Sequence, residues 1–99
     1  MKNGYEIRWT DYALEELEQT IHYLENHFSE KEIKKLARKI ESITEIISQN
    51  PFAFPKSDKQ PIYKVVILKY NSMYYRISEN EVQIVSFFSN RQNPNKRKI

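Results

Sequence analysis

Apolar and polar residues alternate at the start of the chain, and the period then changes to that of a helix. Tyr5, Ile7 and Trp9 are separated by charged residues, and this alternation predicts a β-strand. After Thr10, which is a suitable helix N-cap, apolar residues recur every three or four positions. These residues are Leu14, Leu17, Ile21, Leu24 and Phe28. The pattern predicts a helix with one buried face and an acidic opposite face.

A second helix is predicted to begin almost at once and to end at Asn50-Pro51. Ser29 and Glu32 have the spacing of a capping box at its start. Its apolar positions repeat the same spacing at Ile33, Leu36, Ile40, Ile43 and Ile47. The polar face carries a set of basic residues, Lys31, Lys34, Lys35, Arg38 and Lys39. So short a break predicts an antiparallel helical hairpin, whose apolar faces pack on each other or together cover a sheet.

The second half of the chain returns to strand periodicity after a loop that contains three prolines. The loop spans 51–61 and includes Phe52 and Phe54, which we expect to anchor it to the core. Three strands follow at 63–69, 73–77 and 82–88, with turn signals at Asn71-Ser72 and Glu79-Asn80. Connections this short predict an antiparallel meander.

These elements predict an α+β fold in the order β-α-α-β-β-β, with a helical hairpin packed on one face of a mainly antiparallel sheet. We expect a single domain over residues 1–99, in which 89–99 form a polar, basic tail. The other face of the sheet is then left uncovered for a partner or for the tail. Lys64, Tyr74 and Arg76 stand at alternating strand positions, but the face that each takes depends on register, which the sequence leaves open.

Composition excludes several classes of function. The 99 residues include no cysteine, so the chain has no disulfide, no thiolate metal site and no cysteine nucleophile. His22 and His27 lie five apart, whereas metal-binding pairs on helices favour spacings of about 3 or 4, and we expect neither a metal nor another cofactor. No apolar run approaches the ~20 residues of a membrane helix, and the first residues lack the apolar stretch of a signal peptide. We therefore expect a cytoplasmic protein.

Charge is distributed unevenly between the two halves of the chain. Residues 1–50 carry 7 basic and 10 acidic residues, and residues 51–99 carry 9 and 3, which gives net charges of −3 and +6. The basic half favours an anionic partner, either nucleic acid or an acidic protein segment. Ordinary scatter of surface charge explains the same numbers. The acidic first helix and the basic second helix can also neutralise each other by pairing at the surface.

Three short motifs occur in order along nearly the whole chain. They are Ile7-Arg8-Trp9-Thr10 with Ala13 and Leu17, then Asn50-Pro51, then Tyr74-Tyr75-Arg76-Ile77 with Val82-x-Ile84 and Arg91-Gln92-Asn93-Pro94. In this order they resemble the RelE/ParE superfamily of toxins from bacterial type II toxin–antitoxin modules. The resemblance implies the same fold, a small toxin that inhibits growth, and a cognate antitoxin whose C-terminal segment wraps around it.

Two toxin mechanisms are known under this fold. RelE-like members cleave mRNA on the ribosome, whereas ParE-like members bind DNA gyrase and stabilise its cleaved complex with DNA. If this chain is a nuclease, the resemblance makes Lys64, Arg76 and Arg91 the candidate catalytic residues. Lys64 resembles a basic residue at the start of the family's second strand, and Arg91 resembles an arginine that RelE-like nucleases use on phosphate.

Two departures from the RelE-like pattern favour the ParE-like mechanism. Residues 89–99 contain neither Tyr nor His, and Ser72 and Met73 occupy the stretch where RelE-like nucleases carry an arginine. General acid–base chemistry then lacks an obvious agent, since the strand tyrosines would need a neighbouring cation to act. We therefore expect a non-catalytic inhibitor of gyrase, with a ribosome-dependent mRNA endoribonuclease as the alternative.

A non-catalytic nucleic-acid-binding module is a further hypothesis, in which the strand tyrosines would stack on bases. These are Tyr63, Tyr70, Tyr74 and Tyr75. The toxin hypotheses share an uncovered basic sheet face that binds an acidic, amphipathic antitoxin segment. The residues expected to bind the target or the antitoxin are Lys64, Lys69, Tyr74, Arg76 and Arg91. We expect Lys64, Arg76 and Arg91 to share one concavity.

Overall fold

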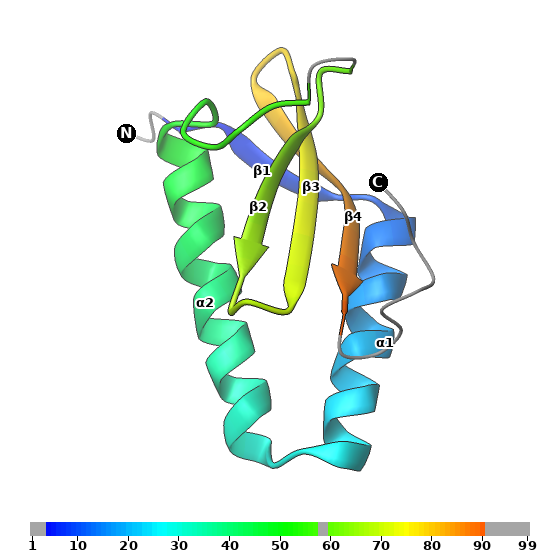
Figure 1. The fold of residues 1–99 in the computed structure, drawn as a ribbon. Helices are drawn as coiled ribbons and strands as arrows, with labels where there is room; N and C mark the ends of the chain where they lie inside the picture. Colours follow the sequence, from blue (N-terminus) through cyan, green and yellow to red (C-terminus); the bar gives the residue numbers. More distant parts are fainter. Residues whose placement is uncertain (1–3, 58–59, 91–99) are drawn as a thin grey trace.

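The computed structural model of the protein describes residues 4–57 and 60–90. Its elements are β1 (Glu6–Trp9), α1 (Asp11–His27), α2 (Glu30–Gln49), β2 (Tyr63–Ile67), β3 (Asn71–Ser78) and β4 (Glu81–Ser89), as Figure 1 shows. The predicted order β-α-α-β-β-β and the α+β class are confirmed. β4 includes Ser89, which the sequence analysis assigned to the tail, and residues 91–99 lie outside the described part of the chain.

The four strands form one sheet in the order β1-β4-β3-β2. β3 pairs antiparallel with both β2 and β4, as the short connections predict. β1 pairs in parallel with β4, so that Trp9 lies opposite Ile84. The first and last strands of the chain are therefore neighbours, and the sheet is mainly antiparallel as expected.

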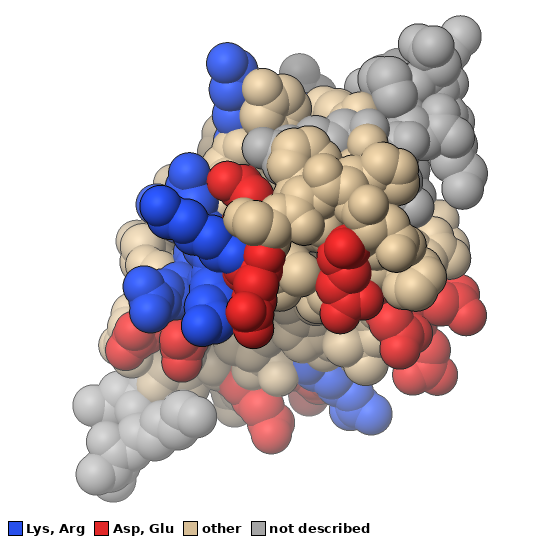
Figure 2. Space-filling view, turned by 90° about the horizontal axis from the view of Figure 1, so that it is seen from below, with Lys and Arg blue, Asp and Glu red and all other residues tan. Residues whose placement is uncertain are grey.

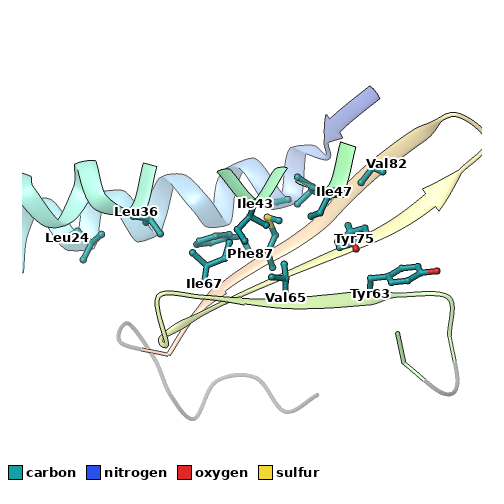
Figure 3. Close-up of a cluster of buried hydrophobic side chains, with 13 residues drawn as sticks. Leu24, Leu36, Ile43, Ile47, Tyr63, Val65, Ile67, Tyr75, Val82 and Phe87 are labelled. Carbon is teal, nitrogen blue, oxygen red and sulfur yellow. The ribbon is translucent and has the colours of Figure 1, made fainter. Parts of the chain in front are cut away.

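Both helices lie on the same side of the sheet, and the core fills the space between the two layers (Figures 1 and 3). The predicted apolar stripe of α2 is confirmed, because Leu36, Ile43 and Ile47 are buried in this core. The strands contribute the side chains that point toward the helices, Tyr63, Val65, Ile67, Met73, Tyr75, Val82, Ile84 and Phe87. The helical hairpin thus covers one face of the sheet, as predicted.

The predicted buried face of α1 is confirmed at Leu24, which lies in the core, and at Leu17, which packs against it, but it differs at both ends. Leu14 and Phe28, the two ends of the predicted stripe, are 47% and 41% exposed, whereas Ala13 and Thr20 are buried. α1 packs beside β4, and small side chains allow the two elements to approach closely. The Thr20 hydroxyl donates to the Glu16 carbonyl at 3.0 Å, so its burial leaves no polar group unsatisfied. Close packing therefore selected small residues over the most hydrophobic ones.

The predicted start of α1 is confirmed, and it also ties the helix to the sheet. Thr10 Oγ1 accepts a hydrogen bond from the backbone N–H of Ala13 (3.1 Å), as an N-cap does. The backbone N–H and the hydroxyl of Thr10 both donate to the carbonyl of Ile84, at 3.0 and 3.1 Å. The capping box predicted at Ser29 is wrong: this residue is the N-cap of α2, but its side chain makes no cap hydrogen bond.

The turn between β2 and β3 lies earlier in the chain than predicted. Leu68 and Lys69 have positive φ angles of 53° and 74°, and β3 already begins at Asn71. The Asn71 side chain donates to the Ile67 carbonyl at 3.0 Å, so this residue closes the turn from the first position of the strand. The predicted turn at Asn71-Ser72 is wrong because asparagine stabilises a turn from its flank as well as from within it.

The loop after α2 is anchored by Pro51 rather than by Phe52. Phe52 is 62% exposed, whereas Pro51 is buried and its carbonyl accepts a hydrogen bond from the Tyr75 hydroxyl (2.7 Å). Phe54 packs against the core, as expected. Tyr75 also stacks on Tyr63, with ring centroids 5.1 Å apart. Burial, with a smaller contribution from Tyr63, raises the pKa of Tyr75 to about 12, so this phenol remains a donor at neutral pH.

Candidate partner-binding face

One face of the sheet is turned away from both helices, and we call it the outer face. Along β2 the side chains alternate, so that Val65 is buried in the core while Lys64 and Val66 are exposed on the outer face. Lys64 pairs directly with Tyr74 on β3, and paired residues share a face. Arg76 lies two residues further along β3 and takes the same face. The register therefore brings Lys64, Tyr74 and Arg76 together.

Two exposed cations flank a buried tyrosine on the outer face. Tyr74 is 8% exposed, whereas Lys64 and Arg76 are both exposed. The two cations are diagonal neighbours across the β2–β3 pair, a relation that places Cβ atoms about 7–8 Å apart. The Arg76 Nε donates to the Gln83 Oε1 at 2.6 Å, which holds the guanidinium against β4. A negatively charged group bound here would meet cations from two adjacent strands.

Of the other two predicted binding residues, Lys69 lies elsewhere and Arg91 falls outside the described part of the chain. Lys69 lies in the β2–β3 turn, at the opposite end of β2 from Lys64, and its Nζ is 5.7 Å from the centre of the Tyr70 ring. Arg91 lies outside the described residues, so the concavity shared by Lys64, Arg76 and Arg91 stays a prediction. Three of the five predicted residues therefore share the outer face.

Charge on the outer face changes from one edge of the sheet to the other. At the β1 edge Glu6 pairs in register with Glu81, and the Arg8 Nη1 lies 3.5 Å from the Glu81 Oε2. The Arg8 side chain is 72% exposed, so this ion pair contributes under about 1 kcal/mol. Among the described residues, neither Lys64 nor Arg76 has a carboxylate within 4.0 Å. The cationic part of the outer face thus lies over β2 and β3.

The residues paired directly with the two cations are poorly suited to acid–base catalysis. One cation faces Tyr74, whose ring is withdrawn from solvent, and the other faces Gln83, which does not titrate. Ser72 lies on the outer face and Met73 is buried in the core, so neither replaces the arginine that RelE-like nucleases carry in this stretch. Among the described residues, Tyr74 is therefore the one titratable side chain in direct register with these two cations.

The described residues include two surface histidines, no cluster of candidate metal ligands and no membrane-spanning helix. His22 and His27 are exposed on α1 rather than placed on the sheet, in agreement with the prediction of surface histidines. No group of three or more His, Cys, Asp and Glu side chains in residues 4–57 and 60–90 could hold a metal ion. Over the same ranges, neither helix combines the length and the apolar character that crossing a bilayer requires.

Glu16 on α1 supports the outer face, and the sequence analysis missed it. Its Oε1 accepts hydrogen bonds from the Ser86 hydroxyl and from the Phe87 backbone N–H, both at 2.8 Å. β1 pairs with β4 only as far as Ile84. Beyond that residue, Glu16 supplies the hydrogen-bond acceptor that the Phe87 backbone N–H would otherwise lack. Because Ser86 lies opposite Tyr74, Glu16 positions the strand beside the candidate site. The signal in the sequence was a carboxylate on the side of α1 that faces the sheet.

Several solved structures share the fold of this chain. The chromosomal ParDE TA system from P. aeruginosa superposes with a TM-score of 0.72 at 17% identity, over 86% of this chain and 95% of that chain. The YoeB/ParE toxin from Agrobacterium tumefaciens has a TM-score of 0.61 at 14% identity, over 85% and 96% of the two chains. The YoeB dimer from Staphylococcus aureus has a TM-score of 0.59 at 20% identity, over 85% and 94%. At these identities the likeness shows the fold alone.

The sequence itself shows the family. A comparison with curated proteins finds no match. A family model described as "ParE toxin of type II toxin-antitoxin system, parDE" matches residues 7–94, which include every helix and strand from the second residue of β1 to the end of β4. The chain therefore belongs to the ParE toxin family of type II toxin–antitoxin systems.

Proposed function

We propose that this toxin inhibits DNA gyrase without catalysing a covalent step, and that a cognate antitoxin neutralises it by covering the outer face. The observation that carries the proposal is the pairing of Lys64 with Tyr74 and of Arg76 with Gln83. Cations in this setting attract an anionic partner, while no imidazole or carboxylate is paired directly with them to move a proton. Membership of the ParE family supports the same interpretation.

An acidic, amphipathic antitoxin segment suits the outer face. Val66 is 55% exposed on the same strand as Lys64, so a partner can bury an apolar side chain beside an ion pair. Covering an exposed valine contributes about 1 kcal/mol, and the two cations orient the segment through charge complementarity. Binding of this kind combines apolar burial with charge, as in other peptide segments that lie on a protein surface.

Gyrase inhibition suits the outer face because it requires the toxin to bind rather than to make or break a bond. The toxin would act in the cytoplasm, on gyrase that is engaged with DNA. The pairing of Lys64 with Tyr74 and of Arg76 with Gln83 is sufficient for such a function, since the proposal requires the toxin to transfer no proton.

A ribosome-dependent mRNA endoribonuclease is the second candidate, and the grouping of Lys64 and Arg76 on one face favours it. Metal-free RNA cleavage needs a base for the 2′-OH, cations for the phosphorane, and an acid for the leaving 5′-oxygen. The two cations supply the second requirement. Tyr74 is the remaining candidate for proton transfer beside them, and it is 8% exposed. We therefore rank this function second.

The described tyrosines lend little support to a module that stacks bases. Tyr63, Tyr74 and Tyr75 are buried, and Tyr63 and Tyr75 point into the core (Figure 3). Tyr70 is 37% exposed, but it stands apart in the β2–β3 turn. Base stacking needs exposed aromatic faces along a groove, so this hypothesis ranks third.

Purified gyrase and purified ribosomes, tested in parallel, separate the two leading functions. We expect the toxin to block DNA supercoiling and to accumulate cleaved DNA at roughly micromolar concentration, which is typical of transient interfaces. On ribosomes programmed with mRNA, primer extension should show intact transcripts. Codon-linked cuts together with normal supercoiling would overturn the gyrase proposal and establish the nuclease. Arg76→Ala should then abolish the cuts, whereas Arg8→Ala, a matched change at the β1 edge, should leave them.

A further inference from the structure

Five basic residues lie on the solvent-exposed side of α2, and we call them the cation row. They are Lys31, Lys34, Lys35, Arg38 and Lys39. All five are exposed, while Leu36, Ile43 and Ile47 on the same helix are buried. At 3.6 residues per turn Lys31 and Arg38 lie opposite the buried side chains of α2, whereas Lys39 lies at the flank, one turn before Ile43. Figure 2 shows Lys and Arg side chains gathered in one dense cluster on the side of the molecule where α2 lies.

The cation row is not neutralised by α1. The ion pairs within the described residues join Arg8 to Glu81 and His22 to Glu25, and neither involves α2. Pairing between the acidic and the basic helix, which the sequence allowed, is therefore not what the structure shows. The five charges are left facing solvent, where they repel one another and attract an anion.

The shape of the row matches a charged polymer better than a single ion. Between Lys31 and Lys39 it extends for about 12 Å, at 1.5 Å per residue. All five side chains line one shallow hollow of about 520 Å³, which Leu68 of the β2–β3 turn closes at one side. Lys34 and Lys39 differ by about 140° around the helix axis, so the positive charge covers an extended patch rather than converging on a point.

We propose that the cation row binds the phosphate backbone of duplex DNA without reading its sequence. Four of the five residues are lysines, which contact phosphates as point charges rather than reading base edges. An acidic peptide would need several apolar anchors, but the largest exposed apolar side chain between Lys31 and Lys39 is Ala37, and Leu68 is the one larger apolar side chain that lines the hollow. Single-stranded nucleic acid would need aromatic stacking platforms, and this stretch contains no aromatic residue.

The dimensions favour DNA over duplex RNA. The minor groove of B-DNA is about 6 Å wide, so a row of about 12 Å reaches the phosphates of both strands across it. The minor groove of A-form RNA is wide and shallow, and a row of this length reaches across it less well. The surface lies on the helical side of the molecule, so DNA and a segment on the outer face can bind at once.

Fluorescence anisotropy with the full chain and a labelled DNA duplex of about 20 base pairs tests the proposal, in salt from about 50 to 200 mM. The test variant is Lys34→Gln/Arg38→Gln, and the matched control is Arg8→Gln/Lys56→Gln, which removes two exposed cations elsewhere. Glutamine keeps helix propensity close to that of lysine, and thermal melting confirms that each variant is folded. We expect the test variant to bind about tenfold more weakly or worse and to lower the salt slope by roughly 0.9 per cation removed. The control should stay within about twofold of wild type, since its two cations lie outside the row.

Several results would overturn the proposal. They are undetectable binding by the wild type at the lowest salt, equal losses in the test and control variants, and affinity for duplex RNA or single-stranded DNA equal to that for duplex DNA. Binding carried by the basic residues of 91–98 would appear as an unchanged test variant, which also counts against the row. The assay contains no gyrase, so its failure is distinguishable from failure of the proposed function.

Discussion

On the outer face two cations stand on neighbouring strands with a buried tyrosine between them, whereas on α2 five cations follow one helix face. The Arg76 guanidinium is held by Gln83 at 2.6 Å, and strand register sets the position of each charge. The cation row instead presents lysines on flexible stems. The outer face is therefore suited to one specific anionic partner, and the cation row to a repetitive chain of phosphates.

The difference shows that charge counted along a chain is a poor guide to charge in space. Residues 51–99 carry a net charge of +6, but five of their nine basic residues lie outside the described part of the chain. The net acidic half contains the whole cation row. A helix sorts acidic and basic residues onto different faces, so a half with a negative sum can still carry the densest positive surface.

Breaking the core that both surfaces share should have the largest effect. Ile47 is fully buried where α2 meets the sheet, so Ile47→Ala should lower the free energy of unfolding by about 2–5 kcal/mol and weaken both surfaces together. Ile46, which is 46% exposed, is the matched control, and Ile46→Ala should cost under about 1 kcal/mol. Urea denaturation measures both. Equal losses in the two variants would show that α2 does not pack as described.

Removing the Glu16 carboxylate should damage the outer face and spare the cation row. Glu16→Ala leaves the Ser86 hydroxyl and the Phe87 N–H without their acceptor, at a cost of about 1–3 kcal/mol. Glu16→Gln keeps an oxygen acceptor and should lose less. Hydrogen exchange at the Phe87 amide reports the local opening. The exposed neighbour in Glu15→Ala serves as control, and an unchanged exchange rate in Glu16→Ala would contradict the capping role.

Removing charge from the outer face should weaken antitoxin binding, whereas removing charge from the cation row should not. Lys64→Ala/Arg76→Ala should weaken binding of an acidic antitoxin, encoded by the neighbouring reading frame, by about tenfold, because two complementary charges are lost. Lys34→Gln/Arg38→Gln should change that affinity by under about twofold. Calorimetric titration measures both variants. If Lys34→Gln/Arg38→Gln lost more antitoxin affinity than Lys64→Ala/Arg76→Ala, the antitoxin would bind α2 and the assignment to the outer face would be wrong.

The smallest expected effect is a pH dependence at Tyr75, which joins the end of α2 to β3 through Pro51. Its pKa is raised to about 12 in the folded chain, so protonation stabilises the fold below pH 10, and this stability is lost as pH rises toward 12. The loss should reach roughly 1 kcal/mol by pH 11 relative to Tyr75→Phe, which lacks the titrating group. Denaturant unfolding of the wild type and of Tyr75→Phe at pH 8 and 11 measures this loss. An equal change in the free energy of unfolding of the two proteins between these pH values would refute the prediction.

Local signals predicted the element order well. The α2 stripe at Leu36, Ile43 and Ile47 and the Thr10 cap depend on contacts within a few residues, and both were found as expected. The errors at the Asn71 turn and the Ser29 cap arose from local signals with more than one structural outcome, whereas the error in α1 arose where a long-range contact decided the outcome. Because α1 packs closely against β4, Ala13 rather than Leu14 lies on the buried face of α1. The hydrophobicity of the side chains does not indicate how closely the helix and the strand approach.

The sequence predicted which residue types form the candidate site, and the pairing of the strands decided how these residues are arranged. Lys64, Tyr74 and Arg76 were identified from the sequence, but a shift of one residue in register would have moved Tyr74 to the core face. The position of Glu16 on α1 was a signal in the sequence, but its role as an acceptor requires β4 to extend past β1, which no local pattern predicts.

By itself the sequence determined the helices, the strands, their order and the family, because hydrophobic periodicity, caps and short connections are local properties. Only the tertiary structure decided which cations from different strands share a surface, whereas helical spacing in the sequence already grouped the five on α2. The pairing of β2 with β3 gathered Lys64 and Arg76, and the packing of α1 against β4 left the basic side of α2 without its acidic neighbour. Charges act through distances in space, and those distances exist only once the chain has folded.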